Sequence, residues 1–239
     1  MSNKVVLIFG YGPNVGFEVA KAFATRDYKV AVVSRSDKCA SDAKNYLQIQ
    51  ADLADPSSIE GIFSQVIDEL GHPTVVIYNA ASFSFRSSSP LNDQIVGFQS
   101  DNNVNIVSAY IAAYFAIRSF ALAPSEASKT FIYTGNKLPF LVVPPLLSPG
   151  AGKAAAAHLI HYLAEEHKDQ GYKFYYADER KSDGDPVYSA IDGSAHAEFY
   201  TQLSEHQRQG PWNATFVKGQ GYVRFSEEMI QDAVFMGRK

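Results

Sequence analysis

Near its N-terminus the chain runs Val5-Val6-Leu7-Ile8-Phe9-Gly10-Tyr11-Gly12-Pro13-Asn14-Val15-Gly16, an apolar segment followed directly by a glycine-rich one. The apolar segment predicts a strand buried on both faces, which is typical of a parallel sheet. The glycines permit a tight turn, and the helical pattern that follows places this turn at a helix N-terminus. Backbone amides at such a position bind phosphate groups, so the stretch predicts a dinucleotide site.

The spacing of the glycines distinguishes two patterns for such loops. The common pattern G-x-G-x-x-G fails because Val15 stands where its third glycine belongs. The spacing G-x-x-x-G-x-G fits, with Asn14 in place of the middle glycine. Asn is the least costly replacement where a left-handed backbone is needed. We therefore expect Gly10, Gly12, Asn14, Val15 and Gly16 to form the cofactor loop.

Short apolar segments alternate with helical patterns along most of the chain. Strands are expected at Val5–Phe9, Val30–Val33, Tyr46–Ile49, Val75–Tyr78, Phe131–Tyr133 and Phe174–Tyr176. Helices are expected at Val15–Thr25, Asp37–Lys44, Ser57–Glu69, Val104–Phe120 and Lys153–His167. The alternation predicts a single α/β domain over residues 1–239, with a Rossmann-type doubly wound parallel sheet flanked by helices. Ligands bind beyond the carboxyl ends of such strands, so we examined the residues there.

The composition excludes several classes of protein. The 239 residues are 46% hydrophobic, which suffices for one sizeable core. A net charge of -4 gives no electrostatic case for nucleic acid or an anionic membrane as partner. The lone Cys39 excludes an internal disulfide and fits a reducing compartment, while His158 and His161 offer only two metal ligands. The first apolar run is too short to span a membrane and lacks a signal cleavage pattern, so we expect a soluble, cytoplasmic protein without a metal.

The end of the second predicted strand indicates which dinucleotide binds. An acidic residue there accepts the ribose hydroxyls of NAD, whereas arginine pairs with the 2′-phosphate of NADP. This chain has Ser34-Arg35-Ser36, which favours NADP(H), and the two serines add hydroxyl donors. Further along, we expect Asp52 and Leu53 to border the adenine and the small residues Asn79, Ala80 and Ala81 to lie close to ribose.

Five motifs occur in a characteristic order: Gly10–Gly16, Asp52-Leu53, Asn79-Ala80-Ala81, Asn105 and Lys153. Together they resemble the short-chain dehydrogenase/reductase family over essentially the whole chain. The most similar branch is a divergent one with a Gly-x-Gly-Pro loop and a Thr-Gly pair after strand five, here Thr134-Gly135; the segment Gln207–Trp212 also matches it. The resemblance implies a nicotinamide cofactor, a small-molecule substrate, and a homodimer or homotetramer formed through the fourth and fifth helices. The apolar face of Ile106, Ala109, Ala113 and Ala116 suits that interface and equally suits the core.

The resemblance also implies an Asn, Ser, Tyr and Lys tetrad, which this chain carries only in part. Asn105 and Lys153 match, but Pro149 stands where the proton-donating tyrosine belongs. Ser148-Pro149 instead predicts a helix N-cap followed by proline at the first helical position. The place of the serine falls on Asn136, with Thr134 the nearest hydroxyl. Both can donate a hydrogen bond to a substrate oxygen, although an amide cannot act as a general acid.

Loops near residues 82–95, 136–152 and 178–200 are the expected substrate-facing segments. The residues Leu141–Leu147 and Ser82–Arg86 favour a largely apolar pocket wall, or simply packed loops. After the sixth strand, Ala177-Asp178-Glu179-Arg180-Lys181 has two interpretations. It is either a charged, solvated loop, or it places Asp178 or Glu179 beside the nicotinamide as an acid or as a counter-ion.

Three functions are compatible with this pattern. The first is NADP(H)-dependent reduction of a carbonyl or an imine/iminium group on a small apolar molecule, with a non-standard proton donor. An iminium accepts hydride without simultaneous protonation, so it needs no acid. The second is non-redox chemistry, such as isomerisation or cyclisation, in a pocket shaped by bound cofactor. The third is a catalytically inactive NADP(H) binder or sensor.

Overall fold

The computed structural model describes residues 4–36, 45–84 and 90–226, and in these residues eight strands form one sheet. The strands are β1 (Val5–Phe9), β2 (Lys29–Ser34), β3 (Leu47–Gln50), β4 (Val75–Tyr78), β5 (Thr130–Thr134), β6 (Lys173–Arg180), β7 (Asn213–Val217) and β8 (Gly221–Tyr222). Their spatial order is β3-β2-β1-β4-β5-β6-β7-β8, and every neighbouring pair is parallel except β7 and β8. From β1, the strands β2 and β3 extend the sheet to one side, and β4 to β8 extend it to the other. This arrangement confirms the Rossmann-type doubly wound sheet.

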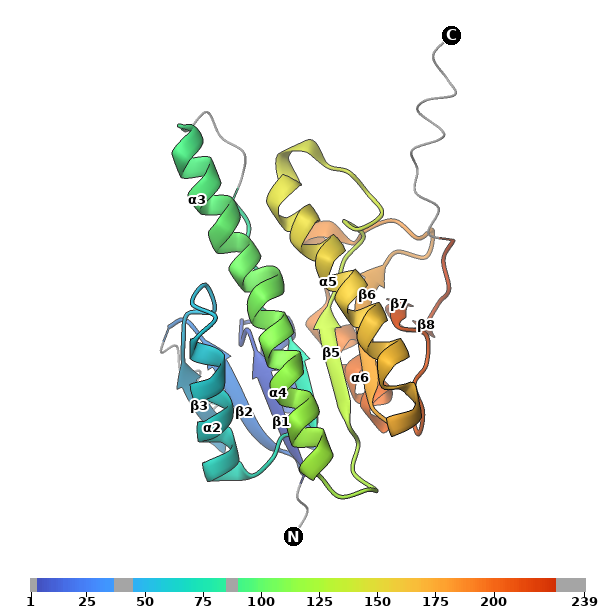
Figure 1. Cartoon of the computed structure of the whole chain (residues 1–239). Helices are drawn as coiled ribbons and strands as arrows, with labels where there is room; N and C mark the ends of the chain where they lie inside the picture. The colour runs from blue at the N-terminus through green and yellow to red at the C-terminus, as the bar shows by residue number, and fades with distance from the viewer. Residues whose placement is uncertain (1–3, 37–44, 85–89, 227–239) are drawn as a thin grey trace.

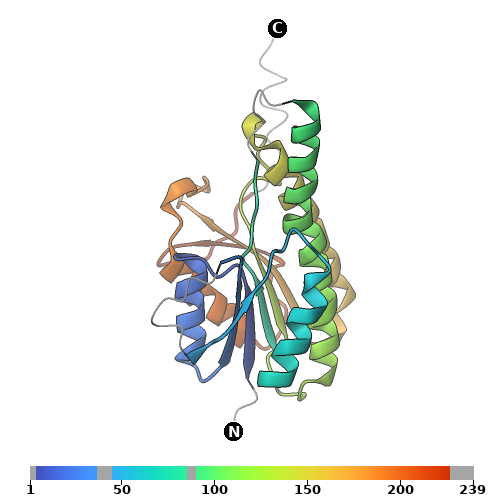
Figure 2. The same ribbon diagram turned by 90° about the vertical axis from the view of Figure 1, so that its left-hand side faces the viewer.

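Helices cover both faces of the sheet (Figures 1 and 2). They are α1 (Val15–Ala24), α2 (Ser58–Leu70), α3 (Leu91–Asn102), η2 (Asn103–Val107), α4 (Ser108–Leu122), η3 (Pro144–Leu146), α5 (Leu147–Glu166), η4 (Lys168–Gln170), η5 (Tyr188–Ala190) and α6 (Gly193–Glu205). Buried side chains of α2, α4 and α5 pack on one face, and those of α1 and α6 on the other. Apolar strand residues supply both cores because alternate side chains point to opposite faces.

The predicted strands are all present, but β6 is much longer than the three residues expected. It runs through Asp178, Glu179 and Arg180, and all eight of its residues are buried. The charged, solvated loop was therefore a wrong interpretation. The reason is tertiary: β7 pairs with residues 176–180 along their whole length, so these charged residues lie in an interior strand. The predicted helix Asp37–Lys44, which contains Cys39, lies outside the described residues.

The helix predicted to begin at Val104 begins at Leu91, because α3, the π-helix η2 and α4 follow one another without a break. Most of α3 is exposed, so it lacks the apolar periodicity that predicts a helix. Within the helical run 91–122, an 18-residue window has a mean hydropathy of 1.4, so by length and composition the run could cross a membrane. Half of that window is buried inside the protein, where α4 packs on the sheet, as expected of a core helix.

The start of α5 also differs from expectation. The helix begins at Leu147, so Ser148 and Pro149 lie within its first turn and Ser148 is not the N-cap. Instead the Ser148 hydroxyl donates to Asp101 Oδ2 at 2.7 Å. Asp101 is a buried carboxylate on α3 that also accepts from the Ser82 hydroxyl and the Ser84 amide. A tertiary hydrogen bond has thus replaced the predicted cap.

Candidate active site

A groove of about 970 Å³ follows the carboxyl ends of β1 to β4. Arg35 lies exposed at its rim. Ten residues predicted to contact the cofactor line it: Gly10, Gly12, Ser34, Arg35, Ser36, Asp52, Leu53, Asn79, Ala80 and Ala81. Further lining residues, which were not among the predicted cofactor contacts, are Tyr11, Pro13, Phe17, Val33, Ala51, Ser82 and Val104. Asn14, Val15 and Gly16 are not part of this lining.

Two glycines of the loop are required by close backbone contacts. Gly10 has a φ of +90°, and a Cβ added there would lie 2.5 Å from the Ala80 backbone nitrogen. A Cβ added at Gly16 would lie 2.6 Å from the Gly10 carbonyl oxygen. At Gly12, by contrast, an added Cβ would meet nothing within 4 Å. Gly10 and Gly16 therefore shape the loop, while Gly12 leaves open space above it.

Asn14 does not adopt the left-handed backbone that we expected of it. Its φ is -106°, so it does not substitute for glycine on conformational grounds. Its carboxamide instead joins the loop to the segment that begins α6: Nδ2 donates to the Ile191 carbonyl and Oδ1 accepts from the Gly193 amide, both at 2.9 Å. Asn14 is thus a tertiary link between the two sides of the site.

Several predicted cofactor residues also make structural hydrogen bonds. Asn79 Nδ2 donates to the Gly10 carbonyl at 2.9 Å, which holds the glycine loop against β4. Asp52 Oδ1 accepts from the Ala54 amide at 3.0 Å and closes a local turn. The Ser34 hydroxyl donates to the Ser36 carbonyl at 2.8 Å. These bonds fix the groove wall in place.

Lys153 lies on α5 and is only 5% exposed. Its Nζ donates to the Thr134 carbonyl at 2.7 Å and lies 4.4 Å from the centroid of the Tyr133 ring. Burial lowers the pKa of Lys153 to about 7, although the nearby Asp178 carboxylate acts in the opposite direction. Lys153 is therefore a cation at low pH and largely a neutral amine at high pH, with the change near neutrality.

Asn105 occupies the π-helix η2 and is fully buried. Its carboxamide bonds both backbone groups of Ser82, accepting from the amide at 3.0 Å and donating to the carbonyl at 2.6 Å. Its own carbonyl accepts from the Tyr133 hydroxyl at 2.8 Å, and the neighbouring Val104 carbonyl accepts from Tyr78 at 2.6 Å. π-Helical turns are common at functional sites, and here buried tyrosines hold the turn's carbonyls.

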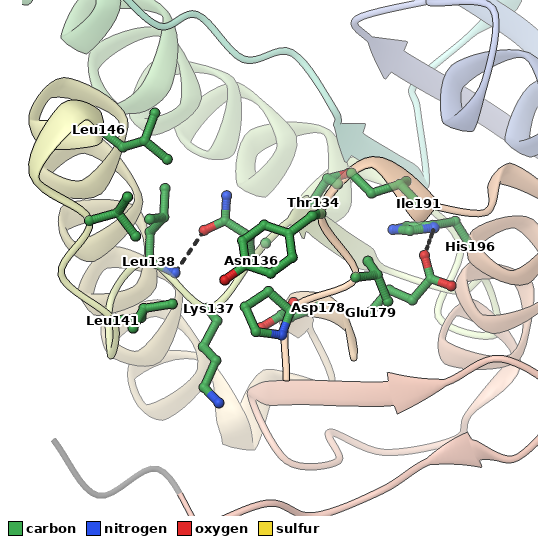
Figure 3. A pocket seen from close by; sticks show the side chains of 15 residues that line it. Thr134, Asn136, Lys137, Leu138, Leu141, Leu146, Asp178, Glu179, Ile191 and His196 are labelled. Atoms are coloured by element: carbon green, nitrogen blue, oxygen red, sulfur yellow. Dashed lines mark hydrogen bonds and ion pairs between the residues drawn. The ribbon is translucent and has the colours of Figure 1, made fainter. Parts of the chain in front are cut away.

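A second cavity, of about 210 Å³, lies at the carboxyl ends of β5 and β6 (Figure 3). Its polar side chains include three predicted catalytic residues: Thr134, Asn136 and Asp178. Its apolar wall is formed by Leu138, Leu141, Val143, Leu146, Pro186, Val187 and Ile191. Glu179 and His196 also line it; both fall within the predicted substrate-facing segment 178–200, although α6, which carries His196, was not predicted.

The polar groups of this cavity are held in specific orientations. Asn136 Oδ1 accepts from the Leu138 amide at 3.0 Å, so Figure 3 shows its nitrogen turned away from that contact. Asp178 pairs with Arg180 at 2.5 Å. Glu179 accepts from the Asp192 amide at 2.9 Å, and burial raises its pKa. The two carboxyl groups thus differ: Asp178 is paired with an arginine, whereas the pKa of Glu179 is raised above its ordinary value.

The histidines give no indication of a metal centre. Within residues 4–36, 45–84 and 90–226, no three His, Cys, Asp or Glu side chains are grouped to hold a metal ion. His161 stacks on Trp212 with a centroid distance of 4.5 Å, which is a packing role.

Comparison with known proteins identifies the family. Residues 4–175 match the family model of the short chain dehydrogenases. The short chain dehydrogenase/reductase dmxR12 of Cryptosporiopsis sp. (strain 8999) is 44% identical over 237 residues, which span 94% of this chain and 96% of the relative. Carbonyl reductase family member 4 of Xenopus tropicalis is 29% identical over 48% of this chain and 50% of its own length. The versicolorin reductase stcU of Emericella nidulans is 31% identical over 36% of each chain.

Solved structures show the same fold. A metagenomic short-chain oxidoreductase in complex with NADP superimposes with a TM-score of 0.75, at 18% identity, over 90% of this chain and 97% of its own. A 3-oxoacyl-[acyl-carrier protein] reductase from Brucella melitensis in complex with NAD gives a TM-score of 0.74 at 13% identity, over 91% and 96%. The chain belongs to the short-chain dehydrogenase/reductase family of oxidoreductases. One solved neighbour holds NADP and another holds NAD. The solved neighbours therefore do not decide which of the two cofactors this chain binds.

Proposed function

We propose that this protein is an NADP(H)-dependent reductase of a carbonyl or an imine/iminium group on a small, largely apolar molecule. The observation that carries the proposal is the pairing of an open cofactor groove with an apolar cavity at the neighbouring strand ends. The Thr134 carbonyl, on the cavity wall, accepts from Lys153. Two relatives, a carbonyl reductase and a versicolorin reductase, support reduction as the direction of the reaction.

The groove fits a dinucleotide. Gly10 and Gly16 have no room for side chains, and the space above Gly12 is open, as a closely approaching pyrophosphate requires. Arg35 at the groove rim would pair with a 2′-phosphate, and Asp52 and Leu53 would border the adenine. When bound, NADPH supplies the hydride. The chain's own residues supply the remaining functions: orientation of the substrate, exclusion of water and control of the proton.

The proton is the step for which this chain departs from its family. Pro149 has no proton to give. Thr134 and Asn136 line the cavity and would bind the substrate oxygen as hydrogen-bond donors. Of the two carboxyl groups, Glu179 is the better candidate for the proton donor, because burial raises its pKa while Asp178 is paired with Arg180. An iminium substrate would need no acid at all.

The test is consumption of NADPH, followed by absorbance, with a panel of ketones, quinones and cyclic imines. Binding of NADPH is measured separately by its fluorescence. Turnover with any panel member supports the proposal. Tight binding without turnover across the panel would instead favour an NADP(H) binder or sensor, consistent with the missing tyrosine. Conversion of a substrate without a change in NADPH absorbance would favour isomerisation or cyclisation.

A further inference from the structure

Tyr200, on α6, contacts Thr134, a residue of the cavity wall, without lining the cavity itself. Its side chain is fully buried, and its hydroxyl donates to Thr134 Oγ1 at 2.8 Å. The ring packs edge-on against His196, one helical turn earlier, with a centroid distance of 5.5 Å. Burial raises the pKa of Tyr200, so this hydroxyl keeps the proton that it donates to Thr134.

This contact restricts what the Thr134 hydroxyl can do. A threonine hydroxyl has one hydrogen and two lone pairs. Because Tyr200 donates to the oxygen, the hydrogen of Thr134 must point to a different acceptor. The backbone carbonyl of Thr134 already accepts from Lys153, and no acceptor for the hydroxyl hydrogen is found among the described residues. Thr134 lines the cavity, so that hydrogen is available to a ligand there.

We propose that Tyr200 is a positioning residue that sets the Thr134 hydroxyl as hydrogen-bond donor to the substrate's carbonyl oxygen. The inference rests on the proposed reductase function and adds the group that meets the oxygen. A donor fixed in advance stabilises the negative charge that develops on that oxygen during hydride transfer. The small cavity limits the substrate at this end to a compact apolar ketone, the size of one or two fused rings.

The experiment is a double-mutant cycle on the full chain. NADPH-dependent reduction of 1-indanone, 1-tetralone and 4-chromanone is measured for wild type, Tyr200→Phe, Thr134→Val, Thr134→Ser and Tyr200→Phe/Thr134→Val. Thr134→Val should lower kcat about 100-fold, as loss of an oxyanion donor does, while Thr134→Ser retains most activity. Tyr200→Phe should lower kcat and raise KM, because the hydroxyl that it orients meets the ketone oxygen in the bound complex as well as in the transition state. In the Thr134→Val background it should have no further effect, because the hydroxyl that it orients is gone.

A matched control separates positioning from folding. Tyr175→Phe removes another buried tyrosine hydroxyl, one that accepts from the Gly210 amide and is not hydrogen-bonded to Thr134, and it should leave the kinetics unchanged. The affinity for NADPH, measured by its fluorescence, should be equal in all variants. Additive effects of the two substitutions, or wild-type kinetics for Tyr200→Phe, would overturn the inference.

Binding of the same ketones to the NADP⁺ complex, measured by calorimetry, separates this inference from the reductase proposal. If the wild type turns over no ketone, the reductase proposal fails for this class. The inference still predicts ketone binding that weakens in Tyr200→Phe and Thr134→Val and survives in Thr134→Ser. A wild type that binds none of the three ketones contradicts it.

Discussion

Lys153 illustrates how the fold changes the chemistry of a single residue. Its amine is enclosed by Tyr133 and the end of β5, and burial lowers its pKa to about 7, from 10.5 in the unfolded chain. Between these two values the unfolded chain binds more protons than the folded protein, so the free energy of unfolding rises with pH. Below pH 7 both states are protonated and this contribution no longer changes.

We therefore expect the stability of the cofactor-free wild type, relative to Lys153→Met, to rise from pH 7 to pH 9 by up to about 1.4 kcal/mol per pH unit. Urea unfolding of both proteins across this range measures the difference. Lys173, whose pKa burial lowers to about 8, is present in both proteins, so its contribution cancels in the comparison. A difference that stays flat with pH would show that Lys153 titrates normally.

Arg35 decides the cofactor in our proposal. Arg35→Ala should weaken NADPH binding roughly 10- to 100-fold, because it removes charge-assisted hydrogen bonds to the 2′-phosphate, and should leave NADH binding nearly unchanged. Fluorescence titration with each cofactor measures both effects. Arg118→Ala, which removes a cation on α4 that lies over the Tyr114 and Phe115 rings, serves as control. Equal weakening of both cofactors would reject NADP(H) selectivity.

Among the elements, the π-helix η2 is held in place by hydrogen bonds from tyrosines on two neighbouring strands. Tyr78, Tyr133 and Tyr176 lie in register on β4, β5 and β6, with 5.7 Å between successive ring centroids. The first two hydroxyls donate to carbonyls of the π-helix. A buried carbonyl without such a donor would be costly, so the tyrosines stabilise the turn that presents Asn105.

Tyr133→Phe should therefore lower the free energy of unfolding by about 1 to 3 kcal/mol, the cost of leaving the buried Asn105 carbonyl without its donor. Chemical denaturation measures the loss. Tyr222→Phe is the control, since Tyr222 is 42% exposed and should change stability little. Equal stabilities of the two variants would mean that water or a backbone shift satisfies the carbonyl.

The elements also show where sequence reasoning succeeds. β1 and β4 were predicted with their exact bounds, because a fully buried parallel strand is a continuous apolar run with sharp ends. The glycine loop was recognised for a comparable reason: a backbone that passes 2.5 Å from where a Cβ would lie permits only glycine at Gly10. The strand constraint acts within a few residues. The constraint on Gly10 comes from the distant Ala80 backbone, but it permits a single residue type and so leaves a local mark as well.

The elements that escaped prediction depend on distant partners. The charged end of β6 is a strand because β7 pairs with it, and β7 itself was not predicted. α6 begins at Gly193, with Asp192 as its N-cap accepting from the Ala195 amide, yet its polar and apolar residues show little periodicity. His196 and Tyr200 fall within the predicted substrate-facing segment 178–200, but without the helix neither could be given a role in the site. The prediction for Asn14 considered only its backbone conformation, whereas its side chain makes the contacts that join the loop to the start of α6.

At the scale of the whole molecule, the outer surface of α4 and α5 is unusually apolar. Ala109, Ala113 and Ala116 are buried and Ile106 packs partly against the same cluster, so of the two alternatives that face belongs to the core. The opposite side exposes Val107, Tyr110, Tyr114 and Tyr162 at 40% to 57%. We propose that these residues form the interface of a homodimer or homotetramer.

The double variant Tyr110→Glu/Tyr114→Glu should dissociate the oligomer, because two buried carboxylates at an interface repel each other and lose hydration. Sedimentation velocity measures the assembly state, with Tyr222→Glu as the surface control. A wild type that sediments as a monomer at micromolar concentration would contradict the proposed interface.

The bond between Asn14 and Gly193 joins residues 179 positions apart, and this separation has a consequence during protein synthesis. At 5 to 20 residues per second, a ribosome needs about 10 to 40 s to proceed from one partner to the other. During that interval the nascent glycine loop lacks its anchor, and the face of α1 that packs on α6 has no cover. The cofactor loop is therefore completed only once α6 has emerged, and until then the apolar face of α1 stays exposed.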